Sequence, residues 1–317
     1  FYAVGLRSEK LYYRPKKERE PIDFLSKKKV FFTISLVLIA AGVITIGVNA
    51  GRGNGAFAYS LEFQGGTSTN VTFDKDYSID EIDKEIVPVV EKVTGDNNVQ
   101  TQKVAGTNQV IIKTVTLDLD KREALNKAMV DNFGVDESKI TAENISSTVS
   151  NEMRRDAVIA VVIATICMLL YIWFRFKDIR FATSAVLALL HDVLVVVGFY
   201  AIARISVGNT FIACMLTIVG YSINATIVIF DRIREEMRGK TKSSDVAAVV
   251  NKSITQTLTR SIYTSLTTFI MVAVLYVMGV SSIKEFALPL MVGVVCGAYS
   301  SVCITGALWY VMKRFKK

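Results

Sequence analysis

The sequence predicts a polytopic α-helical membrane protein with six transmembrane helices and one α+β domain between the first two helices. Of its 317 residues, 51% are hydrophobic, which is too large a share for a soluble protein of this length. Six apolar runs approach or exceed the roughly 20 residues needed to cross a hydrocarbon core. A long polar stretch, residues 49–156, leaves room for one domain outside the membrane.

The basic residues predict how the helices are oriented. Lysines and arginines gather in residues 1–29, at 175–180, within 231–242 and after residue 312. Cytosolic segments carry an excess of Lys and Arg, so we expect these four segments and both termini to be cytoplasmic. This topology explains the net charge of +8. The sequence shows no arginine-rich groove of the kind that would indicate a nucleic-acid partner. The expected spans are 30–48, 157–174, 181–203, 210–230, 262–280 and 286–312, the last five forming one membrane domain at 157–317.

The polar stretch is expected to form a small extracytoplasmic domain. Gly65 and Gly66 predict a turn or hinge, and Ser78 followed by Glu81 is a capping box that begins a helix. The other expected elements are strands at 59–63, 67–73, 98–104, 109–115 and 139–149 and a helix at 120–133. We interpret the order of these elements as β-α-β-β-α-β, that of a ferredoxin-like domain with two helices on one face of a sheet.

The cysteines predict neither disulfides nor a metal site. Cys167, Cys214, Cys296 and Cys303 all lie in apolar runs, where a free thiol behaves as a small hydrophobic side chain. No Cys-x-x-Cys motif occurs, and no histidine is near a cysteine in the sequence. With one histidine and no His-Glu-x-x-His motif, we expect no catalytic residues, no metal and no enzymatic activity.

Five polar residues near the membrane are the candidates for ion coupling. His191 and Asp192 lie about ten residues into the third span, roughly 15 Å from its cytosolic end. Asn224 and Asp231 are seven residues apart on the fourth span, and Arg260 is expected where the fifth begins. Each also has a structural interpretation: a hydrogen-bonded histidine, a carboxylate paired between helices, or a charged anchor at the membrane rim.

Five sequence blocks resemble the SecF members of the SecD/SecF protein-export family, which are of the resistance-nodulation-division type. The blocks are FQGGT at 63–67, ALLHDVLVVVGF at 188–199, GYSINATIVIFDRIRE at 220–235, QTLTRSIYTSLTT at 256–268 and FALPLMVGVVCGAYSS at 286–301. The resemblance implies six spans with a ferredoxin-like domain after the first. It further implies an arginine important for ion coupling at Arg260.

The resemblance also implies a role and a set of partners. The expected role is an accessory of the Sec machinery in the bacterial inner membrane, using a proton or sodium gradient and no bound cofactor to promote preprotein export. The expected partners are SecD, separate or fused upstream of Phe1, the SecYEG channel, YajC as a further candidate, the unfolded polypeptide and membrane lipid. Because Phe1 is not an initiator methionine, the sequence is expected to be part of a longer polypeptide.

One residue departs from the family pattern. Where SecF proteins commonly carry an aspartate after the Asn of the GYSIN block, this chain has Ala225. Alanine cannot bind a proton, so three explanations stay open: reliance on the SecD half, a shifted site using Asn224, Asp192 and His191, or an engineered substitution. Two other functions also stay open, a scaffold that only holds the emerging polypeptide and half of another transporter of this type.

Overall fold

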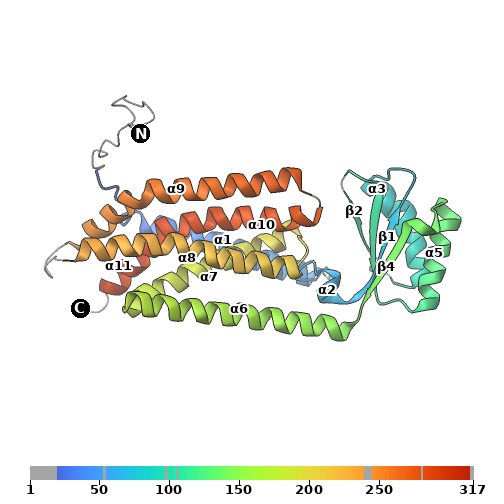
Figure 1. The fold of residues 1–317 in the computed structure, drawn as a ribbon, viewed down its shortest axis with the longest axis horizontal. Helices are drawn as coiled ribbons and strands as arrows, with labels where there is room; N and C mark the ends of the chain where they lie inside the picture. Colours follow the sequence, from blue (N-terminus) through green and yellow to red (C-terminus); the bar gives the residue numbers. More distant parts are fainter. Residues whose placement is uncertain are drawn as a thin grey trace, which may run out of the picture.

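The computed structural model describes residues 20–52, 55–96, 99–104, 106–238, 245–279 and 281–314. Six helices in this described part are long and apolar enough to cross a membrane. Figure 1 shows them packed together, with a small sheet domain at one end. They are α1 (Lys28–Gly51), α6 (Ser147–Phe176), α7 (Ile179–Ala203), α8 (Asn209–Met237), α9 (Val246–Met278), and a last helix formed by α10 (Ser281–Tyr299), the π-helical η5 (Ser300–Thr305) and α11 (Gly306–Arg314).

Each predicted span overlaps one of these helices, but α6, α8 and α9 extend well beyond the predicted spans. Helix α6 begins at Ser147 and not near residue 157, so the strand predicted to reach residue 149 ends at Ile145. The loop expected after residue 230 is helical as far as Met237, and α9 begins at Val246 rather than near residue 262. These additional turns are stable because Ile233 and Ile254 lie in one buried cluster with Trp309. Arg260 consequently lies inside α9 and not at its start.

Apolar exposure and close backbone crossings indicate helices packed in lipid. Large apolar side chains such as those of Leu36, Phe174 and Met278 are exposed on α1, α6 and α9, where hydrocarbon can surround them. At the crossing of α1 and α7, a Cβ on Gly42 would lie 2.7 Å from Gly198 Cα, so only glycine fits there.

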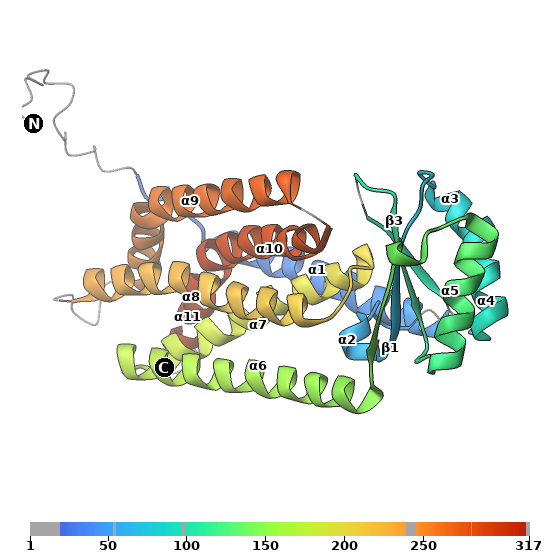
Figure 2. The same ribbon diagram turned by 45° about the vertical axis from the view of Figure 1, so that its right-hand side comes forward.

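The sheet domain has the strand and helix order predicted from the sequence. Its strands are β1 (Gly66–Thr72), β2 (Gln100–Lys103), β3 (Gln109–Thr114) and β4 (Ile140–Ile145), all antiparallel in the order β2-β3-β1-β4. Between the strands lie the helical segment α3 (Ile79–Glu81), η3 (Ile82–Ile86) and α4 (Val87–Thr94), and the helix α5 (Leu119–Phe133). Figure 2 shows these helices on the side of the sheet that faces away from the membrane helices.

The predicted strand at 59–63 is wrong. Residues Leu61–Gln64 form the short helix α2, and Tyr59 makes only an isolated bridge to Val207. The reason is tertiary: Ser60 N–H donates to Val207 O at 3.0 Å, and Val207 N–H donates to Ala58 O at 2.7 Å. This segment therefore pairs with the connection between α7 and α8 instead of with β1.

Further contacts fix the sheet domain to the outer end of the helices. Asn209 N–H donates to Glu62 Oε2 at 3.0 Å, and Gln102 Nε2 donates to Glu285 Oε1 at 3.1 Å. The domain is thus joined to the start of α8 through the segment before β1, and to α10 through β2. Gly65 and Gly66, which connect α2 to β1, have φ values of 74° and 137°, which favour glycine.

Candidate functional site

Asp192 is a carboxylate buried in the middle of the helix bundle. It lies on α7 with no exposed surface. No other carboxylate in the described parts of the six long helices is buried. Its Oδ2 accepts hydrogen bonds from Ser222 Oγ at 2.5 Å and from Ser300 Oγ at 2.7 Å. Since Ser222 is on α8 and Ser300 begins η5, one carboxylate joins three elements.

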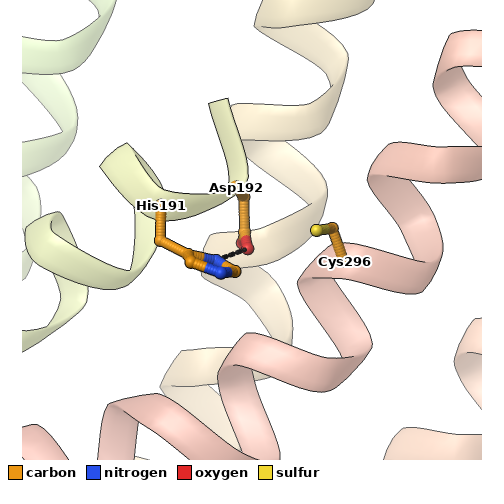
Figure 3. A group of neighbouring side chains, drawn as sticks. All are labelled: His191, Asp192 and Cys296. Carbon is orange, nitrogen blue, oxygen red and sulfur yellow. Dashed lines mark hydrogen bonds and ion pairs between the residues drawn. The ribbon is translucent and has the colours of Figure 1, made fainter. Parts of the chain in front are cut away.

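The second oxygen of Asp192 lies against the neighbouring histidine, as Figure 3 shows. His191 Nδ1 is 2.9 Å from Asp192 Oδ1, and the imidazole is 7% exposed. With a proton on Nδ1 the ring donates to Oδ1, so Asp192 accepts three hydrogen bonds in all. His191 Nε2 then remains buried without a hydrogen-bond partner among the described residues.

Cys296 completes this group, although no histidine lies near a cysteine along the sequence. Ligand atoms of His191, Asp192 and Cys296 lie within 4.8 Å of one another, and all three residues are buried. Nitrogen, oxygen and sulfur ligands of this kind can hold a metal ion such as zinc. Here both oxygens of Asp192 already accept hydrogen bonds, so an ion would have to displace the donors.

The π-helical turn η5 positions one of the donors to Asp192. Thr305 Oγ1 donates to Ser300 O at 3.0 Å, five residues back, as expected within a π-helix. Next to this turn, Tyr299 lies with its ring centroid 6.0 Å from that of His191, and its hydroxyl donates to Phe31 O on α1. Helix α1 is thereby connected to the same region.

A second polar site lies between α8 and α9. Asn224, Ala225 and Arg260 line a small cavity of about 70 Å³ together with hydroxyl side chains of both helices. Residues 222 and 224 of one helix are about 200° apart, so Asn224 is exposed whereas Ser222 points to Asp192. The structure therefore divides the five predicted residues, with His191 and Asp192 in one site and Asn224 and Arg260 in another.

Asp231, the remaining candidate, belongs to neither site. It forms an ion pair with Arg175 at the end of α6, with 3.0 Å between Nη2 and Oδ1, and both side chains are about two-fifths exposed. Asp231 and Asn224 were expected on one face of α8, but they line two different cavities. Asp231 lines a wider groove that adjoins the Asn224 cavity through Val228 and Arg260.

Comparison with known proteins decides the family. Residues 125–315 match the family model described as Protein export membrane protein SecD/SecF, C-terminal. Protein translocase subunit SecF of Petrotoga mobilis is 36% identical over 303 residues, which are 93% of this chain and 98% of that protein. The chain belongs to the SecD/SecF family.

Fused members of the SecD/SecF family are similar to this chain over part of their length. Protein translocase subunit SecDF of Bacillus subtilis is 36% identical, with 92% of this chain and 38% of that protein covered. The crystal structure of SecDF from Thermus thermophilus, described as a translocon-associated membrane protein, has a TM-score of 0.80 and 30% identity. The match covers 95% of this chain, which spans 40% of the length of that SecDF chain.

Family membership, six apolar helices and the matching SecDF structure make this chain a multi-pass membrane protein of the Sec protein-export type. Sequence reasoning found His191 and Asp192 but missed Ser222, Ser300 and Cys296. Serine and cysteine are common on membrane helices, and only packing shows which of them face a carboxylate. A signal was nevertheless present, because Ser222 and Ser300 each lie inside a block that resembles the family.

Proposed function

We propose that this chain is an ion-driven accessory subunit of Sec protein export in a bacterial inner membrane. In this proposal it pairs with a SecD subunit or SecD half, acts at the SecYEG channel, and promotes movement of an unfolded preprotein with a proton or sodium gradient. YajC is a further candidate partner. The observation that carries the proposal is Asp192, a carboxylate deep in the bundle that binds side chains from three elements.

Asp192 supports ion coupling because a charge at membrane depth is costly unless it is paired or functional. Neutralising the carboxylate by a bound proton would remove the acceptor charge that holds Ser222 and Ser300, so α8 and η5 could shift relative to α7. The family's usual carboxylate position holds Ala225, which cannot take this part. We therefore assign ion coupling within this chain to Asp192, with His191 as its hydrogen-bond partner.

The arrangement of the chain supports an extracytoplasmic sheet domain with both termini cytoplasmic. Helices α6 and α11 both end at the end of the bundle opposite the sheet (Figure 1), and α11 is basic in its last turn. Arg175, in the last turn of α6, forms the ion pair with Asp231. The positive-inside rule assigns that basic end to the cytosol. The antiparallel β-α-β-β-α-β order with helices on one face favours a ferredoxin-like classification.

Exposed polar side chains on two membrane helices support the proposal that a partner such as SecD binds within the membrane. Asn224 on α8 and Arg260 and Thr264 on α9 are exposed in the single chain, although they belong to helices apolar enough to cross a membrane. Polar side chains in membrane helices face a protein partner or a watery path more often than lipid. This stripe is the surface on which we place the SecD half.

The test is preprotein translocation into vesicles that contain this chain, its SecD partner and SecYEG, with and without an ion gradient. We expect the gradient to stimulate translocation and Asp192→Asn to abolish the stimulation while leaving the complex assembled. Equal translocation with and without a gradient would contradict the proposal. Translocation that stays fully gradient-dependent in Asp192→Asn would instead contradict the assignment of coupling to Asp192.

Ala225 favours one alternative, in which the chain is a scaffold that holds the emerging polypeptide without coupling to ions. The substitution Ala225→Asp discriminates the two functions in the same vesicles. A scaffold predicts no change in export, whereas a gain in gradient dependence excludes it.

A further inference from the structure

Arg260 is a cation inside a membrane helix with no ion-pair partner among the described residues. It lies inside α9, and its side chain lines the cavity beside Ala225 and Asn224 of α8. Asn224 is seven residues from the ion-paired Asp231, about 10 Å deeper along the helix. An arginine at such depth is expected to be neutralised by an anion or to reach water.

The carboxylates nearest to this region are already engaged with other cations. Asp231 pairs with Arg175, and Glu235 pairs with Arg232 at 2.6 Å. Glu236 pairs with Arg232 at 3.0 Å and with Lys252 at 3.3 Å. Asp192 is bound by Ser222 and Ser300 in the separate site described above. Each of these four carboxylates therefore already has partners other than Arg260.

The walls of the cavity provide donors suited to an anion. Tyr221 donates its hydroxyl to Ser265 Oγ at 2.8 Å, which leaves the hydroxyl hydrogen of Ser265 available for another acceptor. The Asn224 amide and the buried Ser261 hydroxyl also line the cavity, with Arg260 supplying the charge. A metal cation would be repelled by the guanidinium, whereas a halide would accept hydrogen bonds from all these groups.

Size and access are also consistent with a small anion. The cavity of about 70 Å³ exceeds the roughly 30 Å³ that one water molecule occupies in the liquid, so it has room for a single halide ion. Val228 and Arg260 are shared with a wider groove of about 580 Å³, lined by Asp231, Glu235 and Gln256 at the basic end of the bundle. That groove gives an anion a route from the aqueous phase.

We propose that this cavity is a chloride site, in which a mobile monovalent anion neutralises Arg260 beside Ala225. The residues that line the cavity all belong to this chain, and its exposed Asn224 and Arg260 lie on the face where we place the SecD half. A carboxylate from a partner subunit has the same charge and would neutralise Arg260 in the same way. The experiment distinguishes chloride from such a carboxylate. The inference does not depend on the proposed function, because it concerns binding and not export.

The test measures thermal unfolding of the purified full chain in detergent as sodium gluconate is replaced by sodium chloride at constant ionic strength. We expect chloride to raise the Tm by about 2–4 °C with a saturable dependence, because it binds only the folded chain. Arg260→Gln should remove the effect, and Arg260→Lys should retain part of it. Ala225→Asp should also remove the effect, because the new carboxylate neutralises Arg260 in place of chloride.

The control is Arg155→Gln, an exposed arginine of α6 beside Asp156, which should keep the full chloride effect. The same measurement on the chain purified with its SecD partner should also show the effect. An equal Tm in chloride and gluconate would overturn the proposal. A full chloride effect in Ala225→Asp, or its loss when the partner is bound, would overturn it as well, and the second result would identify a partner carboxylate as the counter-ion.

Discussion

At the scale of single residues, the structure depends most on the bonds to Asp192. A buried charge is tolerated when donors replace the water it has lost, and here two hydroxyls and one imidazole do so. The donors come from separate elements, so each bond also joins one helix to another. Removing a donor therefore leaves a buried carboxylate partly unsatisfied, which is more damaging than losing a neutral hydrogen bond.

The first prediction is that the contribution of Ser222 to stability depends on the carboxylate of Asp192. Ser222→Ala should lower the free energy of unfolding by about 1.5–3 kcal/mol, the range for hydrogen bonds to charged groups. In an Asp192→Asn background the same change should have a smaller effect, about 0.5–1.5 kcal/mol, because the acceptor is neutral. Thermal unfolding of the four proteins of this cycle in detergent measures the difference.

The matched control for that cycle is Ser184→Ala. Ser184 is also buried, but its hydroxyl donates to the backbone oxygens of Arg180 and Phe181. Its effect should be the same with Asp or Asn at position 192. If Ser222→Ala had equal effects in both backgrounds, the carboxylate would not be what Ser222 stabilises.

The sequence predicted part of this chemistry and missed the rest for a physical reason. Asp192 is a charged residue in an apolar run, and Arg260 was expected where the fifth span begins, so both could be found from residue type and position alone. Whether they share a site depends on which faces of α8 and α9 pack together. Ser222 and Asn224 are two residues apart and belong to different sites, a distinction that neighbouring positions in a sequence do not reveal.

At the scale of elements, the start of α3 shows that a local sequence motif was sufficient to predict where a helix begins. The Ser78 hydroxyl accepts from Glu81 N–H at 3.3 Å, and Glu81 Oε2 accepts from Ser78 N–H at 2.8 Å, which confirms the predicted capping box. The start of α9 was missed because residues 251–260 are largely polar. Its apolar side chains at Val249, Val250 and Ile254 nevertheless follow a helical period and are buried.

The second prediction is a pH dependence at this capping box. The Ser78 N–H and the Lys75 ammonium lower the pKa of Glu81 from 4.5 to about 2. Because the folded pKa is the lower one, ionised Glu81 stabilises the helix start above about pH 4.5, and this contribution disappears as the pH falls toward 2. Hydrogen-exchange protection of residues 79–86 should decline over that range.

Glu81→Gln should remove that decline, because the side chain no longer titrates. Asp80→Asn, which changes a neighbouring carboxylate in the same first turn, should preserve it. An identical decline in Glu81→Gln and in the unmodified chain would show that another group is responsible.

The third prediction concerns the crossing of α1 and α7. Gly198→Ala would place a methyl group 2.8 Å from Gly42 Cα, so the helices must separate, and we expect a loss of about 1–3 kcal/mol in stability. Gly47→Ala, elsewhere on α1, meets no atom within 4 Å and should be neutral or slightly stabilising. Thermal unfolding of the two variants measures the difference, and equal midpoints would mean that the crossing can relax.

At the scale of the whole molecule, Asp192 and the sheet domain are connected through α7, α8 and α10. The elements that meet at Asp192 continue outward to the contacts of Asn209 with Glu62 and of Glu285 with Gln102. Local patterns predicted the six helices and the strand order of the domain. They could not predict how the two parts join, because Ala58 and Ser60 bond to Val207, far away in the sequence.

The last prediction tests whether the sheet domain must move against the membrane helices during export. Cysteines at Gln102 and Glu285, whose side chains are 3.1 Å apart, should be joined by a short bifunctional thiol reagent in a background with Cys167→Ser. If a shift of α10 away from Asp192 is transmitted to β2, this cross-link should abolish gradient-stimulated translocation while the complex stays assembled. The control pair, Gln100→Cys with Lys113→Cys, applies the same chemistry to register partners within the sheet and should leave stimulation intact. Stimulation that persists with the Gln102–Glu285 cross-link complete would show that this contact stays closed throughout transport, and the link from Asp192 to the domain would then have to run through α8 and Glu62 alone.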